Sequence, residues 1–287
     1  MGDHGPGLGV RFPRRKFWKM TGSGNDFVFF DVRAEMGARP TSEPDLESAE
    51  AIGAVCDRRR GIGADGVVFL ENDAECAYGI RYFNRDGSLA EFCGNASLCS
   101  VTLATELRIV SAGESFMFRT SSGPIPGRST GAGSEVGMPA VADASRAFEA
   151  ALEPGESRIG YARVGVPHLV VACGNVDDVN VPDRGRQLRH HPNLPAGANV
   201  NFVSRRGAVW TYRTYERGVE EETLACGSGS VATAAMLMEW TGEPGPVRLQ
   251  TRSGAPLTVS FEGGRPTLAG EGRLVCEGTL RDVAPLP

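Results

Sequence analysis

The chain has 287 residues, enough for one large or two medium domains, and we start from the expectation of two. Hydrophobic residues make up 41% and charged residues 23% of the sequence, which is typical of a folded globular protein. The formal net charge of −5 at pH 7 argues against a nucleic acid or an anionic membrane as a partner, because phosphate binding needs an excess of Lys and Arg on one face.

The N-terminal segment is rich in Gly and Pro and has no apolar stretch of the kind that a secretory signal contains. We therefore expect residues 1–16 to form a flexible tail and the protein to be cytoplasmic. The seven cysteines are scattered and include no C-x-x-C pair, which favours a reducing compartment over a disulfide framework or a structural zinc site. No apolar run approaches the roughly 20 residues of a membrane-spanning helix.

Short runs of apolar, β-branched and aromatic residues, separated by Gly, Asp and Pro, predict strands along the whole chain. In chain order these runs are 27–31, 66–70, 80–83, 115–119, 169–172, 200–203, 209–215 and 257–261. Helical patterns are rarer. Apolar residues at a three-residue spacing predict a surface helix over 44–58, and a shorter helix is expected around 185–190.

Two further helices are expected to be buried, because residues 96–109 and 229–240 are small or apolar nearly all the way round. Each helix follows a Cys-Gly pair, Cys93-Gly94 in the first half and Cys226-Gly227 in the second. In both halves the same succession precedes the pair: a helix, a Gly-containing turn, a strand and a short Arg- and Gly-containing segment. Internal duplication explains this correspondence.

The sequence therefore predicts an α/β (α+β) fold with two pseudo-symmetric domains. Each domain is expected to be a mixed or antiparallel sheet wrapped round a central buried helix, with the active site in the cleft between the two. We place the N-terminal domain at 17–130 and the C-terminal domain at 131–276, because Ser, Gly and Pro dominate around their junction. Residues 277–287 are expected to return towards the N-terminal domain.

The position of the two Cys-Gly pairs suits proton transfer at a carbon atom. A cysteine at the start of a buried helix lies at the positive end of the helix dipole, beside N–H groups that lack partners, so its thiolate is stabilised. The same N–H groups can bind a carboxylate. Inversion of an α-carbon needs a base on one face and an acid on the other. Cys93 and Cys226 could supply both without pyridoxal phosphate, if the helix starts stabilise the carbanion.

Segments throughout the chain resemble the signature segments of the diaminopimelate epimerase family, in the family's order. They are MTGSGNDF at 20–27, GIGADG at 61–66, FNRDGS at 83–88, FCGN at 92–95, GANVNF at 197–202, YERG at 215–218 and ETLACGSG at 222–229. The resemblance spans nearly the whole chain from Phe17. It implies a two-domain fold with pseudo-twofold symmetry and interconversion of LL- and meso-2,6-diaminopimelate for lysine biosynthesis. It also implies no metal and no organic cofactor.

Carried over position by position, the resemblance implies that Cys93 and Cys226 are catalytic and that His168 and Glu216 tune the thiols. The implied substrate-binding residues are Asn25, Asn84, Gly94, Asn95, Asn199, Glu216, Arg217, Gly227 and Ser228. Arg217 would bind the distal carboxylate, in bidentate fashion. The expected partner is a small amino-acid substrate, without nucleic acid or membrane, and the expected assembly is a homodimer.

Three positions depart from the family's pattern. Val166 replaces the usual Asn, Leu98 replaces an Arg, and Ser228 replaces the commoner Thr. Val cannot hydrogen-bond to the distal end of diaminopimelate, so Val166 and Leu98 leave open a related thiol racemase or epimerase that acts on proline, hydroxyproline or histidine. Ser228 is a milder change because the hydroxyl and the amide remain.

The sequence also bears on three other classes of protein. A phenazine-type isomerase of the same architecture need not keep both Cys-Gly turns. A non-catalytic amino-acid-binding protein needs neither cysteine. The segment 61–66 matches the dinucleotide-binding pattern G-x-G-x-x-G, but it follows charged residues and leads into a strand, which is the reverse of the required order. A nicotinamide enzyme is therefore not expected.

Overall fold

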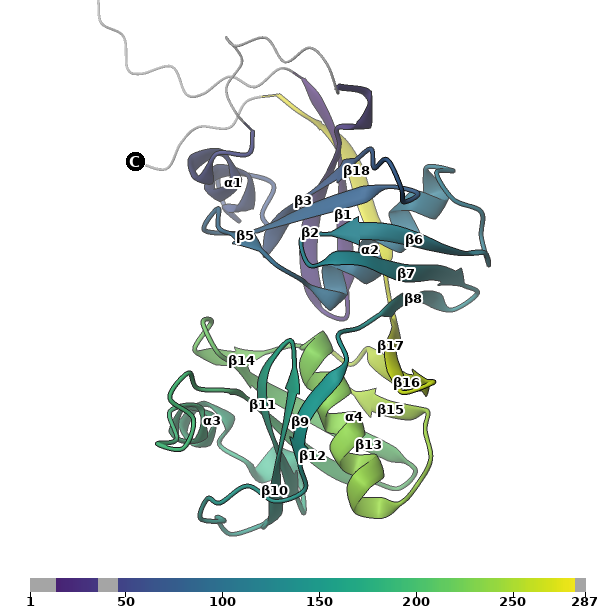
Figure 1. Ribbon diagram of the computed structural model, residues 1–287. Coiled ribbons are helices and arrows are strands. Elements are labelled where there is room, and N and C mark those ends of the chain that lie inside the picture. The colour runs from purple at the N-terminus through teal and green to yellow at the C-terminus, as the bar shows by residue number, and fades with distance from the viewer. Residues whose placement is uncertain (1–13, 36–45, 282–287) are drawn as a thin grey trace, which may run out of the picture. The chain divides into compact units, whose positions relative to one another are not determined.

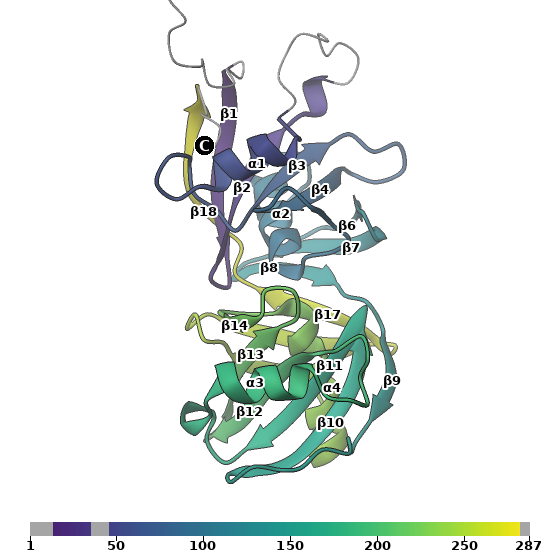
Figure 2. The ribbon, with the colours of Figure 1, turned by 90° about the vertical axis from the view of Figure 1, so that its left-hand side faces the viewer.

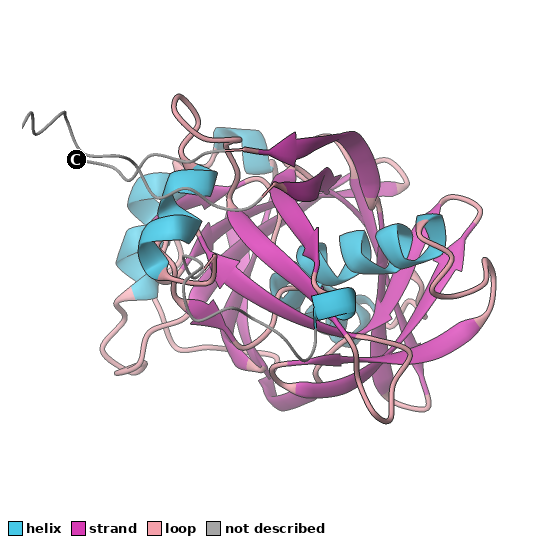
Figure 3. Ribbon diagram, turned by 90° about the horizontal axis from the view of Figure 1, so that it is seen from above, coloured by secondary structure: helices cyan, strands magenta, loops and turns pink. Residues whose placement is uncertain are grey.

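The structure, a computed structural model, describes residues 14–35 and 46–281 and divides into two compact units. The first unit comprises the chain up to Ser129 together with the C-terminal segment from Gly272, and the second comprises Thr130–Glu271 (Figure 1). Strands make up most of the regular structure in both (Figure 3). No helix within the described ranges is long and apolar enough to cross a membrane.

The first unit contains one mixed sheet with two α-helices. Its strands are β1 (Arg15–Gly22), β2 (Asn25–Asp31), β3 (Gly66–Glu71), β4 (Gly79–Asn84), β5 (Leu89–Ala90), β6 (Ser115–Thr120), β7 (Gly123–Thr130) and β18 (Arg273–Leu280). They pair in the order β18-β1-β2-β3-β4-β6-β7, with β5 also on β4. The helices are α1 (Ala49–Cys56) and α2 (Gly94–Glu106), after a short 3-10 turn η1 (Arg33–Glu35).

The second unit has the same kind of sheet. Its strands are β8 (Gly133–Gly137), β9 (Val141–Ser145), β10 (Glu156–Val164), β11 (Val166–Cys173), β12 (Asn199–Arg206), β13 (Val209–Glu216), β14 (Glu221–Thr223), β15 (Val247–Gln250), β16 (Pro256–Glu262) and β17 (Arg265–Gly270). They pair in the order β9-β10-β11-β12-β13-β15-β16-β17-β8, with β14 on β13. The helices are α3 (Val181–Arg189) and α4 (Gly227–Thr241), after a 3-10 turn η2 (Val176–Asp178).

The two units repeat one succession of strand pairs. From β1 to β7 the pairs are antiparallel, parallel, antiparallel, parallel and antiparallel, and the run from β10 to β16 has the same alternation. The helices take equivalent places: α1 lies against β3, and α3 lies against β12 and β13 (Figure 2). The predicted α/β fold class is confirmed, and the repeated order is what internal duplication produces.

The helices α2 and α4 are the buried helices that the sequence predicted. Leu98, Val101 and Leu103 of α2 are fully buried, as are Val231 and other small or apolar residues of α4. The backbone of β10 passes close to α4: a Cβ atom added at Gly160 would lie only 2.7 Å from Met236 Sδ. Neither helix has a polar stripe, so each is surrounded by its own unit rather than lying on a surface.

The predicted first and last residues of two helices differ from those in the structure. The expected surface helix over 44–58 is α1, shorter and with its inner face in the core, where Ile52 and Val55 are fully buried. Ser48 caps it by accepting a hydrogen bond from the amide of Ala51, and residues 36–45 lie outside the described residues. The helix expected around 185–190 begins earlier, at Val181, after the cap Asn180.

The two described ends of the chain pair with each other in the first unit. Residues 1–13 of the expected tail lie outside the described residues, but Arg15 and Lys16 already belong to β1 and pair with Leu280 and Thr279 of β18. Arg15 and Lys16, which were expected to lie in the tail, are therefore part of the sheet. Because β18 pairs with β1, the C-terminal segment belongs to the first unit as far as the described residues extend.

Candidate active site

The first candidate site is the start of α2 in the first unit. Cys93 is the N-cap of this helix and has extended backbone angles, with φ −142° and ψ 113°. Its Sγ accepts a hydrogen bond from the amide of Ala96 at 3.5 Å, so the sulfur satisfies one of the amides that a helix start leaves without a backbone partner. The amide and the helix dipole both favour negative charge on that sulfur.

A chain of side-chain hydrogen bonds holds the next residue of this helix start. Asn95 Nδ2 donates to Asn25 Oδ1 at 2.6 Å, and Asn25 Nδ2 donates to Asp65 Oδ2 at 3.0 Å. Asp65 in turn accepts from Arg58 Nη2 at 2.8 Å. Asn95 Oδ1 is buried, and no described residue provides it with a hydrogen-bond donor. The structure therefore brings Asn25 and Asn95 together and leaves one buried acceptor on Asn95.

Next to these hydrogen-bonded side chains lies a cluster of charged side chains that the sequence did not predict. Asp26 forms ion pairs with Lys19 at 2.7 Å and with Arg58 at 2.7 Å. Burial alone would raise the pKa of Asp26, but the hydrogen bonds from Arg58 and Lys19 outweigh it and lower the pKa to about 2. Asp26 and Asp65 thus both form ion pairs with Arg58, and these ion pairs stabilise the turn that carries Asn25.

Asn84, the other predicted binding residue of the first unit, lies at the end of β4. Its Nδ2 donates to Ser88 Oγ at 3.0 Å, and its amide donates to the Ser88 carbonyl at 2.9 Å. These contacts close the turn between β4 and β5. The turn-forming role that Asn has beside Gly is therefore visible for Asn84.

The second candidate site is the start of α4 in the second unit. Cys226 is the N-cap, with φ −130° and ψ 116°, and only 7% of the residue is exposed. Its Sγ lies 3.6 Å from Ser228 Oγ, and its carbonyl accepts from the amide of Ser230 at 2.9 Å. Gly94 and Gly227, the first residues of α2 and α4, are both buried. The prediction that both Cys-Gly pairs start buried helices is confirmed.

Glu216 lies beside the second thiol. Burial raises the pKa of its carboxyl group, although hydrogen bonds with the side chains of Thr223 and Cys226 act in the opposite direction. The net effect is a carboxyl group that holds its proton more readily than an exposed Glu. The second unit therefore brings the predicted residues Glu216 and Cys226 into hydrogen-bond contact.

The remaining predicted residues of the second unit lie at the ends of neighbouring strands. His168 of β11 stands opposite Asn199 of β12, and Asn199 Oδ1 accepts from the amide of Arg217 at 2.7 Å. Arg217 Nη1 donates to the carbonyl of Ala196 at 3.2 Å. His168 is fully buried; this burial, and secondarily the charge of Arg217, lower its pKa to about 3. The imidazole is therefore neutral.

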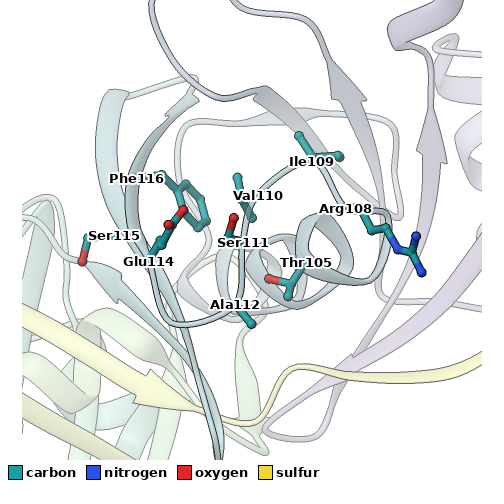
Figure 4. A pocket seen from close by; sticks show the side chains of 9 residues that line it. All are labelled: Thr105, Arg108, Ile109, Val110, Ser111, Ala112, Glu114, Ser115 and Phe116. Atoms are coloured by element: carbon teal, nitrogen blue, oxygen red, sulfur yellow. The ribbon is translucent and has the colours of Figure 1, made fainter.

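A cavity of about 510 Å³ lies at the opposite end of α2 (Figure 4). It is lined by Thr105, Arg108, Ile109, Val110, Ser111, Ala112, Glu114, Ser115 and Phe116. None of the predicted site residues is among them, so this cavity is separate from the helix start at Cys93. Within the described ranges no three His, Cys, Asp or Glu residues are grouped so that they could hold a metal ion.

The structure thus combines two repeated α/β units with a cysteine-capped buried helix in each. Solved structures share this fold: a phenazine biosynthesis protein of the PhzF family from Bacillus anthracis has a TM-score of 0.71 at 13% identity, covering 94% of this chain and 99% of that one. A hydroxyproline epimerase from Agrobacterium vitis has a TM-score of 0.65 at 16% identity, covering 94% and 92%. At such identities the likeness concerns the fold alone.

Sequence comparison is more specific. The family model described as diaminopimelate epimerase matches residues 17–141 and 160–272. The diaminopimelate epimerase of Gemmatimonas aurantiaca is 44% identical over 281 residues, which cover 92% of this chain and 98% of that protein. That of Aquifex aeolicus is 39% identical over 252 residues, covering 86% and 90%. The chain belongs to the diaminopimelate epimerase family and is an isomerase.

Proposed function

We propose that this protein interconverts LL-2,6-diaminopimelate and meso-2,6-diaminopimelate through Cys93 and Cys226. One sulfur, as thiolate, takes the α-proton, and the electron pair of the C–H bond remains on the α-carbon as a carbanion. The other sulfur, as thiol, gives its proton to the opposite face. The observation that carries the proposal is the N-cap position of both cysteines, each at the start of a buried helix in a repeated unit.

The polar groups near each thiol support a division of roles. The amides at Gly94 and Asn95 and at Gly227 and Ser228 would hold the carboxylate next to the reacting carbon. Asn25, Asn84, Asn199 and Arg217 would bind the other polar groups of the substrate, which carries two amino and two carboxylate groups. Glu216 would tune Cys226 through the hydrogen bond between their side chains. His168 would tune the reacting thiols while its imidazole ring stays neutral.

We also propose that the two compact units are the two epimerase domains, with the segment from Gly272 returning to the first, and that the enzyme acts as a homodimer. Its place would be lysine biosynthesis in the cytoplasm, without metal or organic cofactor. The mechanism supports the cytoplasm, because a thiolate and a thiol can exchange protons only while both cysteines stay reduced.

The test is to incubate the reduced protein with LL-diaminopimelate in heavy water and to follow isomer composition and α-deuterium together. The proposal requires meso product that has gained deuterium, and loss of inversion in both Cys93→Ala and Cys226→Ala. Val166 and Leu98 favour a second candidate, a racemase or epimerase for proline, hydroxyproline or histidine. Inversion of one of these, with no exchange in diaminopimelate, would establish that candidate instead.

A further inference from the structure

A buried side-chain network lies between β12, β13 and the start of α4. Its centre is Asn201 of β12, which is fully buried. Asn201 Nδ2 lies 2.9 Å from the carbonyl of Leu169, which can only accept a hydrogen bond. This contact fixes the orientation of the amide. Asn201 Oδ1 accordingly accepts from Tyr212 Oη and from Thr214 Oγ1, both at 3.0 Å.

The orientation of Asn201 determines where His168 carries its proton. The second hydrogen of Asn201 Nδ2 points to His168 Nδ1, 3.3 Å away. An amide nitrogen cannot accept a hydrogen bond, so Nδ1 must be the acceptor and must be unprotonated. The proton of the neutral ring is then on Nε2. Protonation of Nδ1 would set two donors against each other, so the same contact disfavours the imidazolium ion.

Nε2 of His168 is left as a donor that needs an acceptor. It is buried, and no described residue provides it with a hydrogen-bond partner. A buried donor without an acceptor is costly, so such a group indicates a ligand or a reacting group that supplies one. The network also reaches the second thiol's helix, because Tyr212 Oη lies 3.3 Å from the carbonyl of Cys226.

The packing of α4 keeps this arrangement in place. A Cβ atom at Gly229, in the first turn of α4, would lie 2.3 Å from Asn201 Oδ1 and 2.5 Å from Tyr212 Oη. Only glycine permits the helix backbone to approach Asn201 so closely. Asn201 is therefore held between the helix start and His168 and has little freedom to turn its amide over.

We propose that Asn201 is a positioning residue that holds His168 as the neutral tautomer with its proton on Nε2. His168 then donates a hydrogen bond from Nε2 to an anionic atom of the reaction, a thiolate sulfur or a substrate carboxylate, and does not take up a proton. The tautomer follows from the contacts within the second unit, whereas its use in catalysis rests on the proposed function. Burial and the charge of Arg217 act in the same direction, against the imidazolium.

The direct test is nitrogen-15 NMR of the full chain labelled at histidine. Correlations between ring protons and ring nitrogens distinguish a protonated nitrogen from an unprotonated one, and the His168→Gln variant identifies the His168 signals. We expect Nε2 protonated and Nδ1 unprotonated, unchanged between about pH 5 and 8. His190, whose side chain is 60% exposed, gives the spectrum of an exposed ring in the same sample. A wild-type His168 with its proton on Nδ1, or on both nitrogens, would overturn the proposal.

A pair of matched variants tests the role of Asn201. Asn201→Asp places a carboxylate near Nδ1 and should move the proton of His168 to Nδ1 and raise its pKa. Asn175→Asp is the control, because Asn175 caps η2 as an acceptor and Asp can keep that contact. It should leave the His168 signals unchanged. Equal spectra for the two variants refute the positioning role, and if Asn201→Asp does not fold, the wild-type spectrum alone decides the tautomer.

Kinetics then separate this inference from the proposed function. With diaminopimelate as substrate we expect Asn201→Asp to lower kcat by about 10²-fold with little change in KM, because one transition-state hydrogen bond is lost. An unchanged kcat in a variant with a moved proton overturns the catalytic use of Nε2. A wild-type protein that has the expected tautomer but exchanges no α-proton supports the tautomer and refutes the proposed function.

Discussion

Replacing Asp65 by Ala would remove the anchor of the hydrogen-bond chain that leads to the start of α2. Asp65 accepts hydrogen bonds from Asn25 Nδ2, from the amide of Asp26 and from Arg58 Nη2. The first two contribute about 1 kcal/mol each, and the third, an ion pair with an Arg side chain that is 58% exposed, about 0–1 kcal/mol. The free energy of unfolding should therefore fall by roughly 2–3 kcal/mol.

The effect of Asp65→Ala on catalysis should be larger than a general loss of stability explains. Asn25 would lose the partner of its Nδ2, and Asn95, held by Asn25, would be free to shift beside Cys93. A misplacement of about 1 Å at a reacting group costs on the order of 10²-fold, so we expect kcat/KM for diaminopimelate to fall by about 10- to 100-fold. Initial rates with both isomers, measured well below the unfolding midpoint, give this ratio.

Asp73→Ala is the matched control. Asp73 also lies in the first unit, accepts from the backbone amides of Glu75 and Cys76 and forms an ion pair with Arg119. It has no part in the chain from Asp65 to Asn95, so its loss should lower stability by a similar amount and leave kcat/KM nearly unchanged. If the two variants lower kcat/KM equally, Asn25 and Asn95 are not positioned through Asp65 and the reasoning fails.

Three further predictions concern the two sites. Cys93→Ser and Cys226→Ser should each lower the rate of inversion by about 10²–10⁴-fold, measured as product formation in heavy water, and a single tolerated replacement would exclude the two-thiol mechanism. Glu216→Gln tests the raised pKa of Glu216. The protonated carboxyl group stabilises the folded protein below the ordinary pKa of Glu, and this stabilisation is lost as the pH rises through the raised pKa of Glu216. The melting temperature of the variant should therefore exceed that of the wild type by a margin that grows with pH, and a constant margin counts against the assignment. Val166→Asn should raise kcat/KM for diaminopimelate by about 2- to 10-fold through one new hydrogen bond; no gain, or a loss, would mean that Val166 does not face the distal group.

The parts of the fold that were predictable are those with a strong local pattern. The helices α2 and α4 have small and apolar residues on every side and begin at a Cys-Gly pair, so their burial and their starts are visible in the sequence. Strand β10 shows the opposite case. Its burial does not follow the two-residue period of a strand, because Ser157 and Arg158 are both exposed and Ile159 and Gly160 are both buried, and β9 and β11 pair with it on either side. Its pairing, more than its composition, makes it a strand.

The contacts that organise the first site could not be predicted because they join distant segments. Asn25 and Asp65 are 40 positions apart and Asn25 and Asn95 are 70 apart, so no local period relates them. Asn201 was missed for another reason. A polar residue in the middle of a strand that is otherwise buried is a signal, but only the partners Leu169, Tyr212 and Thr214 show what it does.

The repeat is symmetrical in its strands but not in the groups beside its thiols. The pairing of β3 with β4 ends with Gly66 opposite Asn84, and that of β12 with β13 ends with Val200 opposite Tyr215. The groups at the two sulfurs nevertheless differ: Cys93 has an amide donor at its sulfur, and Cys226 has beside it a carboxyl group with a raised pKa. Inversion in either direction needs one thiolate and one thiol at any moment. Under the proposed mechanism, these unequal surroundings would let one sulfur act as the thiolate while the other acts as the thiol.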